Sequence, residues 1–317
     1  MSNQQKNFAF VFPGQGSQAI GMLNEIAGQY TEVKQTFDRA SSVVGKDLWQ
    51  LVTEGPEADL NQTENTQPVM LAAGVAMWEL WCKLSSVRPA WMAGHSLGEY
   101  TALVCSGALA FEDGIRLVSE RARLMQAAVP AGVGAMAAIL GLDDDQVIAI
   151  CAAGAADNEI VSAVNFNAPG QVVIAGHKAA VERAAEAAKA AGAKRAVLLS
   201  VSVPSHCALM QPAAEQLAAS LQNITINSPN VGLIHNVDVE AHSTAEAIRG
   251  ALTEQLYKPV RWVETINYLN NQGVNRFVEC GPGKVLMALN KRIAKEAEHW
   301  AIYDSATLTQ AVEQLND

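Results

Sequence analysis

The stretch that decides the fold is Pro89-Ala90-Trp91-Met92-Ala93-Gly94-His95-Ser96-Leu97-Gly98-Glu99. An apolar approach leads into a G-x-S-x-G motif, and the segment from Glu99 to Leu109 then has the composition of a helix. A nucleophilic serine requires a sharp strand-to-helix turn, where glycines let the neighbouring backbone pass closely. The helix N-terminus then directs N–H groups at a developing oxyanion. The motif predicts Ser96 as a nucleophile, and a tight Gly-rich turn without chemistry is the alternative.

Composition indicates a compact α/β enzyme, because half of the 317 residues are apolar and only 17% are charged. The net charge of −10 argues against broad nucleic-acid binding. The apolar run Phe8–Phe12 is too short for the core of a signal peptide, and no run approaches the ~18 apolar residues that span a bilayer. We therefore expect a cytoplasmic protein that binds neither nucleic acid nor membrane.

The cysteines and histidines do not indicate a metal site. The chain has five cysteines, which are scattered and form no C-x-x-C pair, so we expect reduced thiols. No spacing among them and the six histidines is typical of metal ligands. We expect no metal site.

The N-terminal segment predicts a buried strand over Phe8–Phe12, a Gly-rich loop, and a helix over residues 19–30. The loop formally matches a dinucleotide fingerprint, Gly14-x-Gly16-x-x-Ala19. Pro13 precedes the first glycine, however, and no strand ending in an acidic residue follows at the usual distance. A dinucleotide-binding module remains an alternative, while the loop offers backbone N–H groups to a substrate.

Helical patterns flank the Ser96 motif on both sides. Gln67 and Pro68 open an apolar helix that runs to Leu84, and a second helix begins at Phe111 with acidic residues in its first turn. This second helix carries Arg121 and Arg123, and a helix packed beside the Ser96 element would aim one of them into the site. The alternative is an arginine that points into solvent, which is the commoner outcome on a helix.

A change in the pattern of predicted helices and strands at Pro130 indicates an inserted domain. Residues 130–201 show the order strand, helix, strand, strand, helix, strand, which is that of a ferredoxin-like unit. We expect this small domain within a larger α/β domain formed by residues 1–129 and 202–317. In the larger domain, Arg276–Cys280 is expected to be the final core strand.

The best candidate for a general base follows the inserted domain. In Val203-Pro204-Ser205-His206 the histidine lies at the junction of a strand and a helix, where loops carry chemistry in α/β folds. His95 is adjacent to Ser96, but we expect its side chain to point away along the turn. A structural role for His206 remains the alternative.

Five segments in a fixed order resemble one family. They are Pro13-Gly14-Gln15-Gly16-Ser17-Gln18, Gly94-His95-Ser96-Leu97-Gly98-Glu99, Val164-Asn165-Phe166-Asn167, Val203-Pro204-Ser205-His206 and Glu279-Cys280-Gly281-Pro282-Gly283-Lys284. Together they resemble the malonyl-CoA:acyl carrier protein transacylases of type II fatty acid synthesis, over about Phe8 to Ile293. The resemblance implies an α/β-hydrolase-like large domain with an inserted ferredoxin-like small domain.

The resemblance also implies roles for individual residues. Ser96 is similar to the family's nucleophile and His206 to its general base. Gln255 is implied to orient His206 through its backbone carbonyl. The backbone N–H groups of Gln15 and Leu97 are implied to form the oxyanion hole.

The implied substrates are malonyl-CoA and the phosphopantetheine thiol of acyl carrier protein, exchanged through a malonyl-serine in a ping-pong sequence. Arg121 is implied to bind the malonyl carboxylate as a bidentate pair. Asn165, Met125 and Gln67 are implied to line the acyl pocket. The resemblance requires no metal and no organic cofactor.

Two basic groups are candidates for docking the acidic carrier protein, Lys194 with Arg195 and Lys291 with Arg292. We expect a monomer. A serine hydrolase remains the main alternative, with an acid as third triad member; Asp143, Asp144, Asp145 and Asp157 qualify by chain order. A transacylase for another acyl group, or for a polyketide carrier, is a further alternative.

Overall fold

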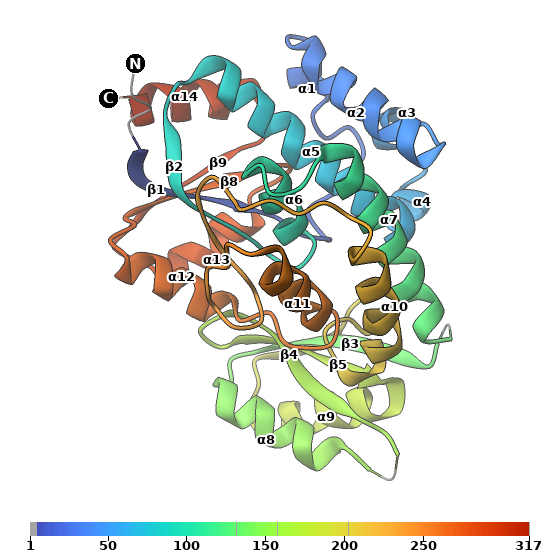
Figure 1. Ribbon diagram of the computed structural model, residues 1–317. Coiled ribbons are helices and arrows are strands. Elements are labelled where there is room, and N and C mark those ends of the chain that lie inside the picture. The colour runs from blue at the N-terminus through green and yellow to red at the C-terminus, as the bar shows by residue number, and fades with distance from the viewer. Residues whose placement is uncertain (1–4, 131, 157, 202, 317) are drawn as a thin grey trace.

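The computed structural model describes residues 5–130, 132–156, 158–201 and 203–316. A five-stranded parallel sheet with the order β7-β2-β1-β8-β9 forms the centre of the larger part (Figure 1). Its strands are β1 (Gln5–Phe12), β2 (Arg88–Gly94), β7 (Gly232–Ile234), β8 (Arg276–Cys280) and β9 (Glu298–Ile302). The predicted strand at Phe8–Phe12 is confirmed as part of β1, which lies in the middle of the sheet.

The apolar run in β1 supplies both faces of the sheet, because successive side chains of a strand point to opposite sides. Phe8, Phe10 and Phe12 enter one core, whereas Ala9 and Val11 enter the other. All five side chains are fully buried. This two-sided burial explains why the strand is continuously apolar instead of alternating.

Helices cover both faces of this sheet (Figure 1). The core on the phenylalanine side includes residues of α2, α5 and α7, and the opposite core includes residues of α12 and α13. The helices are α1 (Asn24–Ala27), α2 (Thr31–Val44), α3 (Leu48–Glu54), α4 (Glu57–Leu60), α5 (Thr63–Leu84), α6 (Gly98–Cys105), α7 (Phe111–Ala128), η1 (Ala208–Met210), α10 (Gln211–Leu221), α11 (Ala245–Gln255), α12 (Trp262–Asn271), α13 (Val285–Ile293) and α14 (Ser305–Asn316). Within the described ranges, no helix has the length and apolarity needed to cross a membrane.

The inserted segment forms a separate antiparallel sheet with the order β4-β5-β3-β6. Its elements are β3 (Gly134–Leu140), α8 (Asp144–Gly154), β4 (Val161–Ala168), β5 (Gln171–His177), α9 (Lys178–Ala190) and β6 (Arg195–Leu198). Element order and strand order together are those of a ferredoxin-like unit, as predicted. The domain limits at 130 and 201 stay a prediction, since the neighbouring positions 131 and 202 lie outside the described residues.

Contacts between the two parts fix the small sheet beside the end of the large one. The Val260 N–H donates to the Val164 carbonyl at 2.8 Å, and the Phe166 N–H donates to the Val260 carbonyl at 3.0 Å. Arg292 on α13 donates to the Pro169 carbonyl and to Gln171 Oε1, both at 2.5 Å. These bonds hold β4 against the large domain (Figure 1).

Several sequence-based boundaries were wrong. The helix expected at residues 19–30 is reduced to the single turn of α1, and α5 begins at Thr63, ahead of Gln67. Pro68 lies inside α5, where the sequence suggested a start. Arg276–Cys280 is not the final core strand, because Glu298–Ile302 adds β9 at the edge of the sheet and pairs with it. The segment after Ala294 therefore contributes a strand and the helix α14.

Candidate active site

The serine turn joins β2 to α6 and is as tight as the motif requires. A Cβ on Gly94 would lie 1.9 Å from the Gly98 carbonyl carbon, and a Cβ on Gly98 would lie 2.0 Å from the Phe12 carbonyl oxygen. Ser96 has φ of 53°, the left-handed region that costs energy for a residue with a side chain. Its N–H donates to Asn236 Oδ1 at 2.8 Å, which stabilises this conformation.

His206 faces the serine from the opposite side of the site. Its Nε2 lies 2.7 Å from Ser96 Oγ, and its Nδ1 lies 2.6 Å from the Gln255 carbonyl oxygen. A carbonyl only accepts, so Nδ1 carries the proton and Nε2 is left to accept from the serine hydroxyl. The histidine also has a positive φ, 64°, and its N–H donates to the Leu256 carbonyl at 2.9 Å. Both members of the pair are therefore held by backbone contacts in the orientation of a nucleophile and its base.

The surroundings of His206 keep its ring neutral. Burial and, next, the positive charge of Arg121 lower the pKa of His206 to about 3, against the bond to the Gln255 carbonyl, which raises the pKa. A neutral imidazole is the form that accepts a proton from the serine.

Arg121 extends from α7 into the same site and is only 2% exposed. Its Nη1 donates to Gln67 Oε1 at 2.9 Å, and its Nη2 donates to Gln255 Oε1 at 3.1 Å and to Ser96 Oγ at 3.4 Å. Burial lowers the pKa of Arg121. Among the described residues, no carboxylate forms an ion pair with this guanidinium. A buried cation without an anionic partner is suited to bind an acidic substrate group.

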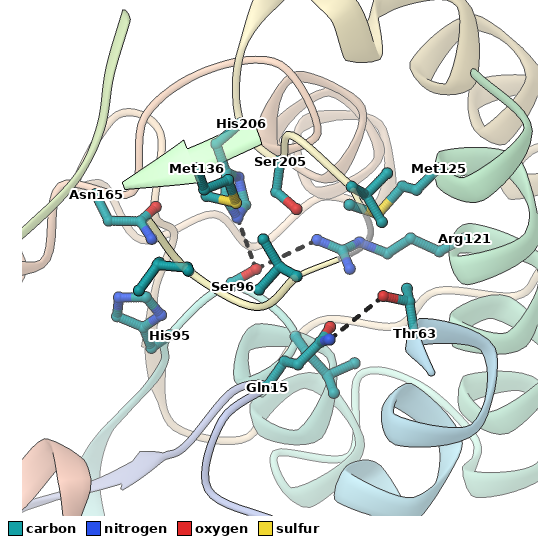
Figure 2. Close-up of a pocket in the computed structure, with 14 residues that line it drawn as sticks. Gln15, Thr63, His95, Ser96, Arg121, Met125, Met136, Asn165, Ser205 and His206 are labelled. Atoms are coloured by element: carbon teal, nitrogen blue, oxygen red, sulfur yellow. Dashed lines mark hydrogen bonds between the residues drawn. The ribbon is translucent and has the colours of Figure 1, made fainter. Parts of the chain in front are cut away.

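A cavity of about 120 Å³ opens onto these side chains (Figure 2). A cavity of this size has room for a short acyl group. Its wall combines large-domain residues with residues from the small domain and the segment that leaves it. The wall consists of Gln15, Thr63, His95, Ser96, Leu97, Arg121, Met125, Met136, Asn165, Leu199, Val201, Val203, Ser205 and His206.

Two backbone N–H groups at this wall are free. Within the described part of the chain, neither the Gln15 N–H nor the Leu97 N–H donates to a protein acceptor. Leu97 caps the N-terminus of α6, where the helix dipole favours negative charge. Gln15 comes from the loop after β1, and its side chain donates to Thr63 Oγ1 at 3.3 Å. Two backbone N–H groups of this kind can form an oxyanion hole.

Of the remaining residues expected in the pocket, two line the cavity and one lies behind its wall. Asn165 and Met125 line the cavity, and Asn165 Oδ1 has no hydrogen-bond partner among the described residues. Gln67 is absent from the described wall and lies behind it, against Arg121 and Met125. His95 is also one of the lining residues, and its ring contacts Asn167, with Nε2 2.7 Å from Asn167 Oδ1, and packs against Trp262. That its side chain points away from Ser96 stays a prediction.

The acids that a hydrolase triad would use lie elsewhere or cannot be placed. Asp143 caps α8 in the small domain by accepting from the Gln146 N–H at 2.8 Å, and Asp144 and Asp145 follow in the first turn of that helix. Asp157 lies outside the described residues. The position of a triad acid beside His206 Nδ1 is occupied by the Gln255 carbonyl.

Comparison with known proteins agrees with this geometry. Residues 9–312 match the model of the acyl transferase domain family. The chain is 54% identical over 306 residues to the malonyl CoA-acyl carrier protein transacylase of Escherichia coli K12, covering 96% of this chain and 99% of that protein. The same enzyme of Haemophilus influenzae is 56% identical, with 98% and 99% covered. The chain belongs to the malonyl-CoA:acyl carrier protein transacylase family.

Solved structures of transacylases have the same fold. A malonyl-transacylase in complex with a type II polyketide acyl carrier protein superimposes with a TM-score of 0.96 at 54% identity, covering 98% of this chain and all of that one. The Coxiella burnetii transacylase gives 0.97 at 49% identity, with both chains fully covered. The dinucleotide-binding alternative is therefore set aside, and this chain is an acyltransferase with the predicted two-part α/β fold.

The sequence-based site lacked the buried polar residues behind the transacylase serine. Glu99 accepts from the Asn236 N–H at 3.0 Å, and Glu99 Oε1 lies 2.7 Å from His235 Nδ1. Asn236 in turn donates to the Gly94 carbonyl at 2.7 Å. The available signal was a charged residue, Glu99, inside an otherwise apolar helix, because a fully buried carboxylate requires partners.

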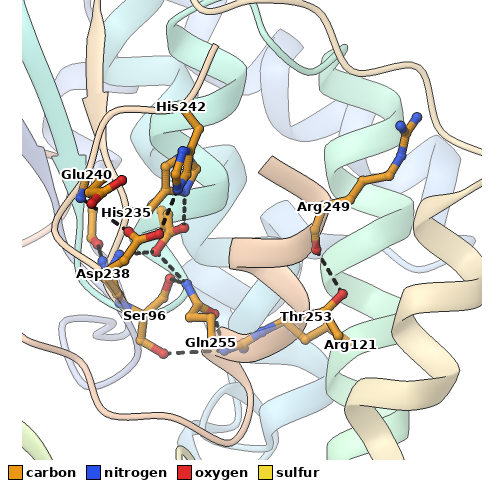
Figure 3. A network of polar contacts seen from close by, with 12 residues as sticks. Ser96, Arg121, His235, Asp238, Glu240, His242, Arg249, Thr253 and Gln255 are labelled. Atoms are coloured by element: carbon orange, nitrogen blue, oxygen red, sulfur yellow. Dashed lines mark hydrogen bonds and ion pairs between the residues drawn. The ribbon is translucent and has the colours of Figure 1, made fainter. Parts of the chain in front are cut away.

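One cluster in the described residues has the composition of a metal site. Side-chain ligand atoms of Asp238, Glu240 and His242 lie within 4.8 Å of one another (Figure 3). Glu240 is exposed, and His242 Nε2 lies 2.6 Å from Asp238 Oδ2, so a surface ion pair accounts for the group. The absence of a metal from the transacylase site stays a prediction.

Proposed function

We propose that this enzyme transfers the malonyl group from malonyl-CoA to the phosphopantetheine thiol of an acyl carrier protein in fatty acid biosynthesis. The observation that carries this proposal is the buried guanidinium of Arg121, which lies 3.4 Å from Ser96 Oγ and has no anionic partner among the described residues. Such a cation selects an acyl group that ends in a carboxylate. The names of the relatives support the same donor and acceptor.

In the first half-reaction His206 Nε2 takes the proton of Ser96 Oγ, and Ser96 attacks the thioester carbonyl of malonyl-CoA. The tetrahedral oxyanion accepts hydrogen bonds from the Gln15 and Leu97 N–H groups. The carbon–sulfur bond breaks, His206 returns its proton to the sulfur, and free CoA leaves behind a malonyl-Ser96 ester.

In the second half-reaction the thiol of the carrier's phosphopantetheine arm takes the place of CoA. His206 removes the thiol proton, the sulfur attacks the ester, and the proton returns to Ser96 Oγ as the malonyl thioester leaves. The Gln255 carbonyl holds the histidine tautomer in both halves, because it accepts from Nδ1–H. Each of the two oxyanion donors is expected to lower the activation barrier by about 3–4 kcal/mol.

The carrier is proposed to dock at the cavity mouth near β6. Leu199 and Val201 line the cavity, and the exposed pair Lys194 and Arg195 lies at the start of the same segment. Lys291 is also exposed and available, whereas Arg292 already binds the small domain. We propose a monomeric, cytoplasmic enzyme, with a polyketide carrier as the alternative acceptor.

The test is the identity of the acylated residue and the choice of acyl group. Brief incubation with malonyl-CoA should add one malonyl group, mapped by peptide mass spectrometry to Ser96 and absent in Ser96→Ala. Arg121→Ala should lower kcat/KM for malonyl-CoA by about a hundredfold or more while acetyl-CoA is retained or improved. A malonyl group on a cysteine, or unchanged malonyl selectivity in Arg121→Ala, would refute the proposal.

A further inference from the structure

We infer that the side chain of Gln255, separately from its backbone carbonyl, positions Arg121 and so determines selectivity for a carboxylate-bearing acyl group. The inference rests on the proposed function, which assigns the substrate carboxylate to Arg121. It makes Gln255 a positioning residue with two separable tasks, one performed by its main chain and the other by its carboxamide.

The carboxamide of Gln255 lies between the nucleophile and the arginine (Figure 3). Its Oε1 accepts from Arg121 Nη2 at 3.1 Å. Its Nε2 donates to the Ser96 carbonyl and to Glu99 Oε2, each at 2.9 Å. Gln255 is fully buried, so these bonds are shielded from water.

The partners permit only one orientation of this carboxamide. A guanidinium only donates, and the Ser96 carbonyl only accepts. A flipped amide would set N–H against N–H at Arg121 and oxygen against oxygen at Ser96. The oxygen of Gln255 is therefore aimed at Arg121 by the groups on the other side of the amide.

Glu99 is the anchor of this arrangement. It is fully buried, and its two oxygens are bonded to His235 Nδ1, the Asn236 N–H and Gln255 Nε2. These bonds hold the carboxylate away from Arg121. The guanidinium therefore forms no ion pair with Glu99 and can pair with a substrate carboxylate. Arg121 is instead held by two neutral acceptors, Gln255 Oε1 and Gln67 Oε1. Neutral acceptors fix the arginine without neutralising it.

Main chain and side chain of Gln255 therefore act on different partners. The carbonyl accepts from His206 Nδ1, which any residue at this position supplies. The carboxamide aims Arg121, which only glutamine performs here. Substitution of the side chain should consequently change acyl selectivity more than general serine acylation.

The experiment measures kcat/KM for malonyl-CoA and acetyl-CoA in Gln255→Met, which keeps the length of the side chain and removes its polar atoms. The ratio of malonyl to acetyl should fall about tenfold or more. In an Arg121→Ala background the same substitution should change the ratio of malonyl to acetyl by less than about twofold, since the residue through which it affects this ratio is gone. Gln255→Glu, of nearly equal volume, should lower the ratio further because its carboxylate pairs with Arg121.

Asn236→Ala is the matched control, because Asn236 is equally buried and its side-chain amide accepts from the Ser96 N–H, while its contact with Glu99 is made by the main chain and is kept in the variant. It should lower both acyl-CoA rates and leave their ratio within about twofold. Equal losses for both acyl groups in Gln255→Met and Gln255→Glu, or additive losses with Arg121→Ala, would overturn the inference. Failure of the wild-type enzyme to malonylate Ser96 would instead refute the proposed function. Thermal unfolding identifies variants that do not fold.

Discussion

Ser96 and His206 have φ values of 53° and 64°, so both reacting side chains stand on left-handed backbone. Strain of this kind persists where surrounding bonds over-determine the conformation. Here those bonds are the Asn236 amide at Ser96 and the Leu256 carbonyl at His206. The proposed proton transfer therefore joins two residues whose orientation is set mainly by backbone.

The pH dependence of acylation tests the link between His206 and Arg121. Protonation of His206 removes the base, so the acid limb of kcat/KM for acetyl-CoA should lie well below pH 6.5 because the pKa of His206 is lowered to about 3. Arg121→Ala removes a charge that lowers this pKa, so the limb should move to higher pH. Arg123→Ala is the control, since Arg123 is exposed and pairs with Glu120. A limb that stays in place or moves to lower pH in Arg121→Ala would contradict the electrostatic account.

Prediction of single residues from sequence is possible where chemistry depends on residue type. The sequence indicated Ser96 by a motif and His206 by its place at a strand–helix junction, and the structure brings their side chains to 2.7 Å, while their catalytic roles stay predictions. Gln255 could not be found this way, because a main-chain carbonyl leaves no mark on residue type. The Glu99–Asn236 network was also missed, since its members meet only where α6 contacts the loop that follows β7.

The turn between β2 and α6 requires glycine at positions 94 and 98, because a Cβ at either position would collide with neighbouring backbone. Gly98→Ala would drive a methyl group into the Phe12 carbonyl at 2.0 Å, displacing the end of β1 and the loop that carries Gln15. We expect a loss of about 3 kcal/mol or more in the free energy of unfolding, together with loss of acylation. Gly250→Ala on α11 is the matched control, because nothing lies within 4 Å of its added Cβ. It should stabilise by up to about 1 kcal/mol, as measured by urea unfolding. Equal stability of the two variants would contradict the close approach.

Glu279 links the end of β8 to the start of α13. Its Oε2 accepts from the Met287 N–H at 2.7 Å, while burial raises the pKa of Glu279 to about 7. The folded state thus binds more protons than the unfolded state between about pH 4.5 and 7, so stability from this group falls as the pH rises through that window. Glu279→Gln removes this slope, and its stability relative to wild type should increase with pH by an amount on the order of 3 kcal/mol. Parallel stability–pH curves in urea unfolding would contradict it.

Element boundaries show what local pattern lacks. The strand Phe8–Phe12 was evident because a central parallel strand is apolar on both faces. β9 escaped notice because Glu298–Ile302 is a mixed sequence at the edge of the sheet, stabilised by pairing with β8. The start of α5 was misplaced because Pro68 suggests a helix start, whereas tertiary packing tolerates it inside.

At the scale of the whole molecule, the cavity exists only because two domains meet. The small domain contributes Asn165 on β4 and Met136 on β3 to the cavity wall, and the large domain contributes Ser96 and Arg121 (Figure 2). The sequence indicated both domains, but their relative placement depends on long-range bonds such as Val260 to Val164. Long-range pairings of this kind leave no periodic signal in the chain.

Docking of the carrier is a whole-molecule property that charge reversal can isolate. Lys194→Glu with Arg195→Glu should raise KM for the carrier about tenfold and weaken the dependence of this step on salt. Acylation by malonyl-CoA should be unchanged, since neither side chain lines the described cavity. Lys34→Glu on α2, outside both basic groups, serves as the control. Loss of both half-reactions in equal measure would contradict a docking role.

The most direct test of the central claim is a chase of the isolated malonyl-enzyme. After removal of malonyl-CoA, the protein is mixed either with carrier bearing the phosphopantetheine arm or with buffer alone, and the malonyl group is followed by intact-protein mass spectrometry. The account predicts that the group leaves Ser96 and appears on the carrier much faster than it is lost to water. Hydrolysis at a rate equal to or above transfer would show a hydrolytic serine and contradict it.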